Sequence, residues 1–185
     1  LDSDPDLIDS KDAQGRSALY RAGCVYGQFP EGEAVVDLLL ERGAQADIYV
    51  AATFAMAERV EALLSEDSSC ARGTDPEGMT TLHWALRPRR SEGPEMPLRV
   101  TRLLLDAGAD VHAVNPTEDD MQAIHHFGEW GASNLEQANL LVEHGADVNA
   151  ESGIGWTALD YAIDRSRAKM AEHLKSLGGK ESGAR

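Results

Sequence analysis

One phrase recurs along the chain at positions that fix the end of a helix. Residues 103–113 read Leu-Leu-Leu-Asp-Ala-Gly-Ala-Asp-Val-His-Ala, and close copies occupy residues 38–47 and 140–150. Each copy places a glycine directly after an apolar run with helical spacing: Gly43, Gly108 and Gly145. A helix often ends in a left-handed residue, a conformation that glycine adopts without steric cost. The phrase therefore predicts three helices that end in the same way.

A second phrase lies upstream of the first. Residues 75–85 read Asp-Pro-Glu-Gly-Met-Thr-Thr-Leu-His-Trp-Ala, residues 12–22 resemble them, and residues 155–162 carry a third copy. Asp followed three residues later by Gly is typical of a turn, and the Thr or Ser that comes next can hydrogen-bond the first backbone N–H groups of a helix. Together the two phrases predict a unit of turn, short helix, short helix and glycine cap.

This unit resembles the ankyrin repeat, whose signature is Thr-Pro-Leu-His-x-Ala at a period near 33 residues. The resemblance covers residues 11–179 and implies an all-α solenoid of stacked helix-turn-helix units with β-turn fingers. We expect one domain with repeats at about 11–46, 47–74, 75–113, 114–150 and 151–179.

Both ends of this domain carry their own signals. Residues 1–12 align with residues 64–75, so we expect residues 1–10 to be the remnant of a preceding repeat. Lys175 takes a place where earlier copies have Leu or Val, which is typical of a last repeat with nothing packed on its outer side. Residues 180–185 are expected to form a tail.

Three repeats depart from the pattern. Repeat two lacks the turn glycine and the Thr-Pro-Leu-His phrase. In repeat three, three prolines within residues 87–97 predict a loop between the helices that carries Arg87, Arg89 and Arg90. In repeat four, residues 118–120 form an acidic finger tip, and residues 122–130 are expected to form the first helix.

Composition limits the class of partner. The chain has 185 residues, with 17 Lys and Arg against 32 Asp and Glu, which gives a formal net charge of −15. Such a field repels nucleic-acid phosphates, so we expect no nucleic-acid partner. No apolar run approaches the length of a membrane span, so we expect no membrane partner. The isolated Cys24 and Cys70 favour reduced thiols and a cytoplasmic location.

The resemblance also implies where a partner would bind. In the ankyrin family, the finger tips and the inward-facing helix surface form a concave groove that grips other proteins. Exposed apolar and aromatic side chains there would act as anchors, unless they turn inward to fill irregular packing. The residues carried over as partner-binding are Arg16, Phe54, Glu77, Met79, Arg87, Glu118, Asp119, Met121, His126, Glu129, Trp130, Trp156, Asp164 and Arg165.

The histidines offer a possible chemical site. His83 and His125 occupy the signature position, where the resemblance implies that the imidazole bridges neighbouring loops. His126 takes the place of Trp84 and could form a metal or acid–base site with Glu129, Asp119 and Asp120, although a buried or groove-lining histidine is the commoner arrangement. The chain has no nucleophile-elbow phrase and no phosphate-binding glycine loop. We assign no catalytic, cofactor-binding or metal-binding residue.

Three functions remain open at this stage. The leading hypothesis is a non-catalytic module that binds another protein in the groove, and the net charge favours a partner with a basic surface. A second is an inhibitor or immunity-type protein that neutralises a basic enzyme, which only the net charge favours. A third is an enzyme or small-molecule binder with a pocket near the repeat-three insertion and His126.

Overall fold

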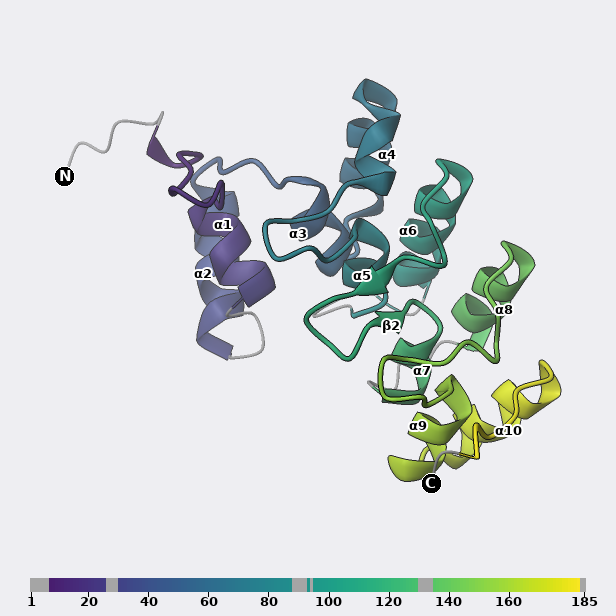
Figure 1. The fold of residues 1–185 in the computed structure, drawn as a ribbon. Helices are drawn as coiled ribbons and strands as arrows, with labels where there is room; N and C mark the ends of the chain where they lie inside the picture. Colours follow the sequence, from purple (N-terminus) through teal and green to yellow (C-terminus); the bar gives the residue numbers. More distant parts are fainter. Residues whose placement is uncertain (1–6, 26–29, 88–92, 94, 130–134, 184–185) are drawn as a thin grey trace.

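The computed structural model describes residues 7–25, 30–87, 93, 95–129 and 135–183, which form pairs of helices stacked along an arc (Figure 1). The first helices of the repeats lie along the inner side of the arc, and α4, α6, α8 and α10 lie along the outer side. The stack confirms the predicted all-α solenoid.

The elements are α1 (Ala18–Tyr20) with a π-helical turn (Arg21–Val25), α2 (Pro30–Glu41), α3 (Ile48–Thr53), α4 (Ala57–Glu66), a 3₁₀ turn (Ser68–Arg72), α5 (Thr81–Ala85), α6 (Glu95–Asp106), β1 (Val114–Asn115), β2 (Met121–Gln122), α7 (His125–Glu129), α8 (Leu135–Glu143), α9 (Ala158–Asp164) and α10 (Ala168–Ser176).

The first helices begin at polar caps. The side chains of Ser17, Asp47, Thr80 and Thr157 each accept a hydrogen bond from the backbone N–H three residues further on. These bonds satisfy N–H groups that have no partner within the helix, which explains the Ser or Thr in the upstream phrase. At α9, Asp160 returns the bond to the N–H of Thr157 and completes a capping box.

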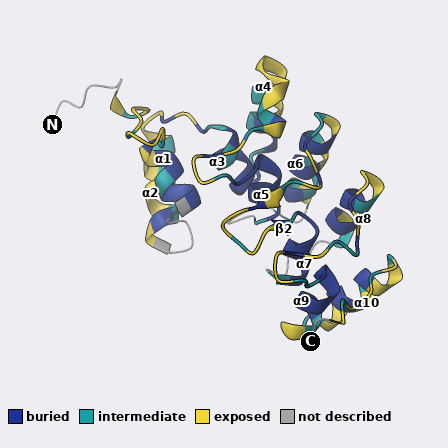
Figure 2. Cartoon of the chain, in the orientation of Figure 1, coloured by how far each residue is buried: buried dark blue, intermediate teal, exposed yellow. Residues whose placement is uncertain are grey.

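The second helices end at the predicted glycines. Gly43, Gly108 and Gly145 have φ values of 93°, 88° and 94°, and Gly178 ends α10 in the same way at 92°. Each of these glycines adopts a left-handed conformation that ends the helix and reverses the direction of the chain. The side chains between the two helix layers form one continuous core. Figure 2 colours the buried residues of both layers dark blue.

Two predicted boundaries were wrong. Helix α6 begins at Glu95, so Pro97 lies inside its first turn rather than in the loop. Proline is tolerated there because its missing N–H would have no partner within the helix. Helix α7 begins at His125 rather than at residue 122, because β1 and β2 pair as a hairpin that takes up Met121 and Gln122. Arg89 and Arg90 lie outside the described residues.

Repeat two lacks a finger altogether. Residues 44–46 are the whole connection from the glycine that ends α2 to the cap Asp47, whereas residues 146–156 connect Gly145 to the cap Thr157. The finger of repeat three is therefore the next one along the stack after that of repeat one.

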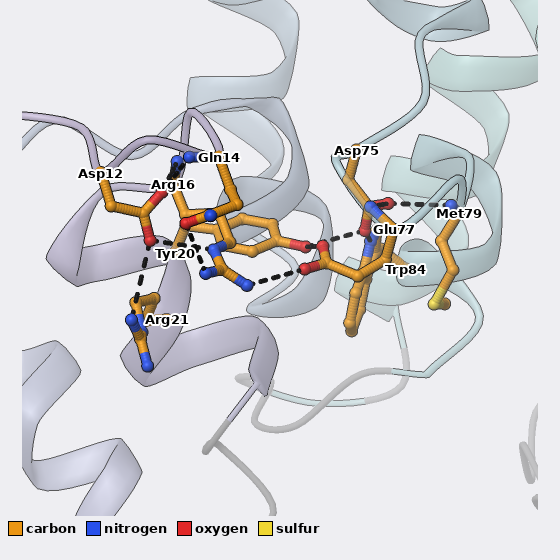
Figure 3. A network of polar contacts seen from close by, with 9 residues as sticks. All are labelled: Asp12, Gln14, Arg16, Tyr20, Arg21, Asp75, Glu77, Met79 and Trp84. Carbon is orange, nitrogen blue, oxygen red and sulfur yellow. Dashed lines mark hydrogen bonds and ion pairs between the residues drawn. The ribbon is translucent and has the colours of Figure 1, made fainter. Parts of the chain in front are cut away.

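A polar network, which we call the one–three bridge, spans this gap (Figure 3). It consists of Arg16 and Tyr20 from repeat one and Asp75, Glu77 and Trp84 from repeat three. The Tyr20 hydroxyl lies 2.9 Å from Asp75 Oδ2 and 2.5 Å from Glu77 Oε2, and Trp84 Nε1 donates to Asp75 Oδ2 at 2.7 Å. Arg16 Nη1 donates to Glu77 Oε1 at 3.2 Å. Burial, together with the hydrogen bond to Glu77, raises the pKa of Tyr20, so the phenol stays protonated as the donor.

We expect Tyr20→Phe to lower the free energy of unfolding by roughly 1–3 kcal/mol, because the partly buried carboxylates lose one of their donors. Urea unfolding followed by circular dichroism measures the loss. Tyr49→Phe is the matched control, since its ring contacts that of Tyr20 while the described residues offer its hydroxyl no hydrogen bond. Equal effects of the two substitutions would contradict a stabilising role for the bridge.

Helix α7 packs tightly against the next repeat at Gly128. A Cβ atom at this position would collide with the carbonyl oxygen of Ala158 and lie 2.7 Å from Cβ of Tyr161. Both partners belong to α9 of the next repeat. Because one obstacle is backbone, a side-chain rotation cannot relieve the collision.

Gly128→Ala is therefore expected to lower the free energy of unfolding by roughly 3 kcal/mol or more, since the two helices must separate. Gly145→Ala serves as a control, because its added methyl group meets nothing within 4 Å but must adopt a left-handed backbone. That strain alone costs roughly 1–2 kcal/mol. If urea unfolding showed the smaller loss for Gly128→Ala, the proposed collision would not control stacking.

Candidate functional site

The finger of repeat four is a tight hairpin with two carboxylates at its tip. The N–H of Met121 donates to the carbonyl of Glu118 at 2.9 Å, and the residues between them, Asp119 and Asp120, have φ values of 46° and 49°. Consecutive left-handed residues in such a turn match the twist of the two strands it joins. The turn exposes both carboxylates, and neither forms an ion pair with a residue that the structure describes.

The finger of repeat five lies directly against this hairpin. The N–H of Gly153 donates to the carbonyl oxygen of Asp119 at 2.5 Å, and a Cβ atom on Gly153 would lie 2.9 Å from the same oxygen. Ile154 follows with half of its surface exposed. Trp156 is half-buried, and its ring meets that of Tyr161 edge-on at 5.2 Å. We call Asp119, Asp120, Ile154 and Trp156 the finger surface, since it combines two exposed acids with one exposed and one half-buried apolar group.

Most other charged residues predicted to bind a partner are engaged within the chain. Arg16 and Glu77 belong to the one–three bridge, Arg87 Nη1 donates to Glu118 Oε1 at 2.8 Å, and Glu129 accepts two bonds from Arg165 at 2.7 and 2.8 Å. Asp164 lies 3.4 Å from Arg165 and stays exposed. Sequence spacing placed these residues on the fingers or the inner side, but it gave no signal for pairs formed between repeats.

The expected exposure of three apolar side chains was wrong. Phe54, Met79 and Met121 are each at most 6% exposed. Phe54 fills the space beside Gly23 of repeat one, where a Cβ would lie 2.9 Å from Cε2 of the ring. Met79 and Met121 each follow the tip of their finger. The N–H of Met79 donates to Asp75 Oδ1, and Met121 pairs with Asn115 in the hairpin. Trp130, the other predicted anchor, lies outside the described residues.

His83 and His125 bridge neighbouring repeats, as their signature position implied. His83 Nε2 lies 3.2 Å from the carbonyl oxygen of Met121, and His125 Nε2 lies 2.9 Å from that of Ala150. A carbonyl only accepts, so each ring donates to the connection of the next repeat. Burial lowers the pKa of His83 to about 4 and lowers the pKa of His125, which keeps both rings neutral.

His126 was also expected on the binding surface, and that expectation was wrong. It is fully buried, its ring lies 5.2 Å from that of His83, and neither of its ring nitrogens has a hydrogen-bond partner. Burial, followed by the nearby His83, lowers the pKa of His126 well below its usual value. The suggested site with Glu129, Asp119 and Asp120 is not assembled, because the described residues contain no group of three possible metal-binding side chains.

Comparison with known proteins agrees with this architecture. A family model of ankyrin repeats, in three copies, matches residues 91–182, about half of the chain. The chain belongs to the ankyrin-repeat family. It is also 30% identical over 146 residues to the B-cell lymphoma 3 protein homolog of Mus musculus; the match covers 76% of the chain but 30% of the length of that protein.

Ankyrin repeats are protein–protein interaction modules, so the finger surface lies on a scaffold of that class. Among the helices of this ankyrin-repeat chain that the structure describes, none has the length and apolar character needed to cross a bilayer.

Since the folded chain holds His126 neutral, acid should destabilise the stack. In the unfolded chain the imidazole has its ordinary pKa of about 6.5. Below that pH the unfolded state binds more protons than the folded state, so the free energy of unfolding decreases as the pH is lowered. We expect His126→Leu to reduce the slope of unfolding free energy between about pH 6 and 5 by up to about 1.4 kcal/mol per pH unit. Stability at neutral pH should be unchanged or higher, because two unpartnered polar atoms leave the core.

Urea unfolding at several pH values provides this slope. His112→Leu is the control because His112 is exposed, and its slope should match that of the unsubstituted chain. A slope for His126→Leu as steep as that of the control would show that the buried ring does not couple protonation to folding.

Proposed function

We propose that this chain is a non-catalytic module that binds a basic protein segment through the finger surface and the adjoining inner side of the stack. The observation that carries the proposal is the pairing of uncompensated carboxylates with exposed and half-buried apolar groups on two fingers held side by side. Asp119 and Asp120 supply the charge, and Ile154 and Trp156 supply the apolar area.

The distribution of charge supports a basic partner. Arg16, Arg87 and Arg165 already have acidic partners within the chain, so they offset internal acids rather than the acids at the finger tips. The net charge of −15 extends the negative field beyond the fingers. Such a field speeds encounter with a cationic segment and disfavours acidic competitors.

The apolar residues support a defined docking site rather than attraction by charge alone. Trp and other large side chains near the centre of an interface commonly contribute most of its binding energy. Trp156 is already held by contact with Tyr161, so little side-chain freedom remains to be lost on binding. Lys or Arg side chains of the partner would then meet Asp119 and Asp120.

The inhibitor hypothesis is a narrower form of the same proposal, supported by charge alone. It adds one requirement, that binding abolishes an activity of the partner. We also propose a cytoplasmic location, which suits Cys24 and Cys70, since both are described and neither is in a disulfide.

The experiment begins with affinity capture by the tagged chain and identification of the captured protein, followed by Kd measurement with the purified pair. We expect Trp156→Ala, and separately Asp119→Asn with Asp120→Asn, to weaken binding at least about 10-fold. Binding of the unsubstituted chain should also weaken more steeply with salt than binding of the double Asn variant.

Asp110→Asn with Asp147→Asn is the matched control. Both carboxylates are exposed in the loops after α6 and α8, so the control changes net charge equally while leaving the fingers intact. If the control weakened binding as much as the finger variant, net charge rather than this site would govern recognition. An unchanged Kd for all variants would place the interface elsewhere.

A further inference from the structure

One position in the second helices reaches the preceding repeat where its hydrogen bonds are defined, in repeats two and four. Val35, Val100, Gln137 and Met170 each lie eight residues before the glycine that ends their helix. Gln137 Nε2 donates to Thr101 Oγ1 of the preceding repeat at 2.8 Å. In repeat two, where no glycine cap follows α4, Arg59 aligns with this position, and its Nε donates to the carbonyl of Ala46 in repeat one at 2.9 Å.

Repeat one carries the same kind of side chain at this position, but there it is exposed. Val100 is 0% exposed and Gln137 is 1% exposed, whereas Val35 is 44% exposed. One helical turn later, Leu140 is 2% exposed and its counterpart Leu38 is 46% exposed. Two branched apolar residues on one stripe of α2 therefore face solvent, whereas their counterparts in repeats three and four are buried or, at Leu103, partly buried.

The first helix of repeat one shows the same difference. Thr81 at the start of α5 is fully buried, and its Oγ1 donates to the carbonyl of Cys70 in the preceding repeat at 3.0 Å. Its counterpart at the start of α1 is Ala18, which is exposed. We call Ala18, Val35 and Leu38 the leading face of repeat one, and Figure 2 shows exposed residues along the outer edge of α2.

The segment that enters repeat one is built like the exit of a repeat. Lys11 forms a bridge with Ser17 as Thr74 does with Thr80, and the N–H of Asp12 donates to Arg16 as that of Asp75 does to Met79. Asp9 accepts from the N–H of Gln45 just beyond Gly43, and Arg72, at the matching position, donates to the carbonyl of Gly108. Residues 7–17 thus occupy the place that residues 70–80 occupy after α4.

We propose that the leading face is the docking surface for one further ankyrin-type helix pair, which precedes repeat one in the stack. The face continues an interface that the internal repeats already form, and its small branched side chains fit the facing side of such a pair. A second copy of this chain, stacked head to tail, fits less well. Its last repeat presents Lys175, exposed where Leu40 and Leu105 pack in earlier repeats, and burying an ammonium group is costly.

The test extends the full chain by one helix pair of its own. Residues 47–63, which hold α3 and most of α4, are joined ahead of Leu1, because Leu1 aligns with Leu64. We expect the helical circular dichroism signal to increase and Tm to rise by about 5 °C, since an added repeat contributes through its interface with its neighbour. A second extension from residues 157–174 offers the same face the unrelated α9–α10 pair.

Substitution of the face separates docking from a general effect of length. Val35→Glu with Leu38→Glu should cancel the rise in both extended chains, while shifting Tm of the unextended chain by less than about 2 °C. Val114→Glu is the control, because Val114 is 45% exposed on a distant finger, and its effect should be equal with and without an extension.

Three outcomes would overturn the proposal. Both extensions could stay unfolded or leave Tm unchanged, although each offers native ankyrin helices in register. The rise could survive the double Glu substitution. Sedimentation of the unextended chain could show a dimer that the double substitution disrupts, in which case the occupant is a second copy.

Discussion

The structure depends on burial between neighbours, since no repeat here can cover its own apolar side chains. The first helices α1, α5 and α7 are no more than five residues long, and isolated helices of that length do not persist in water. Their stability comes from side-chain caps at one end and from the repeat beside them. The packing of Gly128 against α9 is one example, because a Cβ atom at this position would collide with the carbonyl oxygen of Ala158. Stability in such a stack is a sum of interfaces.

The same dependence explains how the chain tolerates a repeat without a finger. In the regular repeats, His83 and His125 donate to the next connection, which lies within reach of an imidazole. Repeat two has no finger to receive such a bond, and the signature histidine is replaced in repeat one by Tyr20. The longer phenol reaches Asp75 and Glu77 of repeat three instead. With no finger in repeat two and Tyr20 in place of the histidine, the polar contacts still continue from the finger of repeat one to that of repeat three. Arg16 balances part of the acidic charge there.

Sequence reasoning succeeded where a feature is repeated and local. Gly43, Gly108 and Gly145 cap helices because each cap depends on a few adjacent residues, and His83 and His125 bridge repeats because the same geometry recurs. It failed for Phe54, Met79 and Met121, since the direction in which an apolar side chain turns depends on space left by another repeat. Only the structure shows that Gly23 opens a place for Phe54. The pairs Arg87–Glu118 and Glu129–Arg165 were missed for the same reason, because their partners are 31 and 36 positions apart.

The finger surface is a property of several repeats rather than of one loop. The hairpin that presents Asp119 and Asp120 is held on one side by His83, which donates to the carbonyl of Met121, and on the other by Gly153, which donates to the carbonyl of Asp119. Trp156 is positioned by Tyr161 of α9, and α9 in turn packs on Gly128. Repeats three, four and five must therefore be stacked before the acids and the apolar groups stand side by side. A rigid scaffold of this kind fixes the separation of the acids from the apolar groups, and under the proposed function that fixed separation would favour one basic partner over another of similar charge.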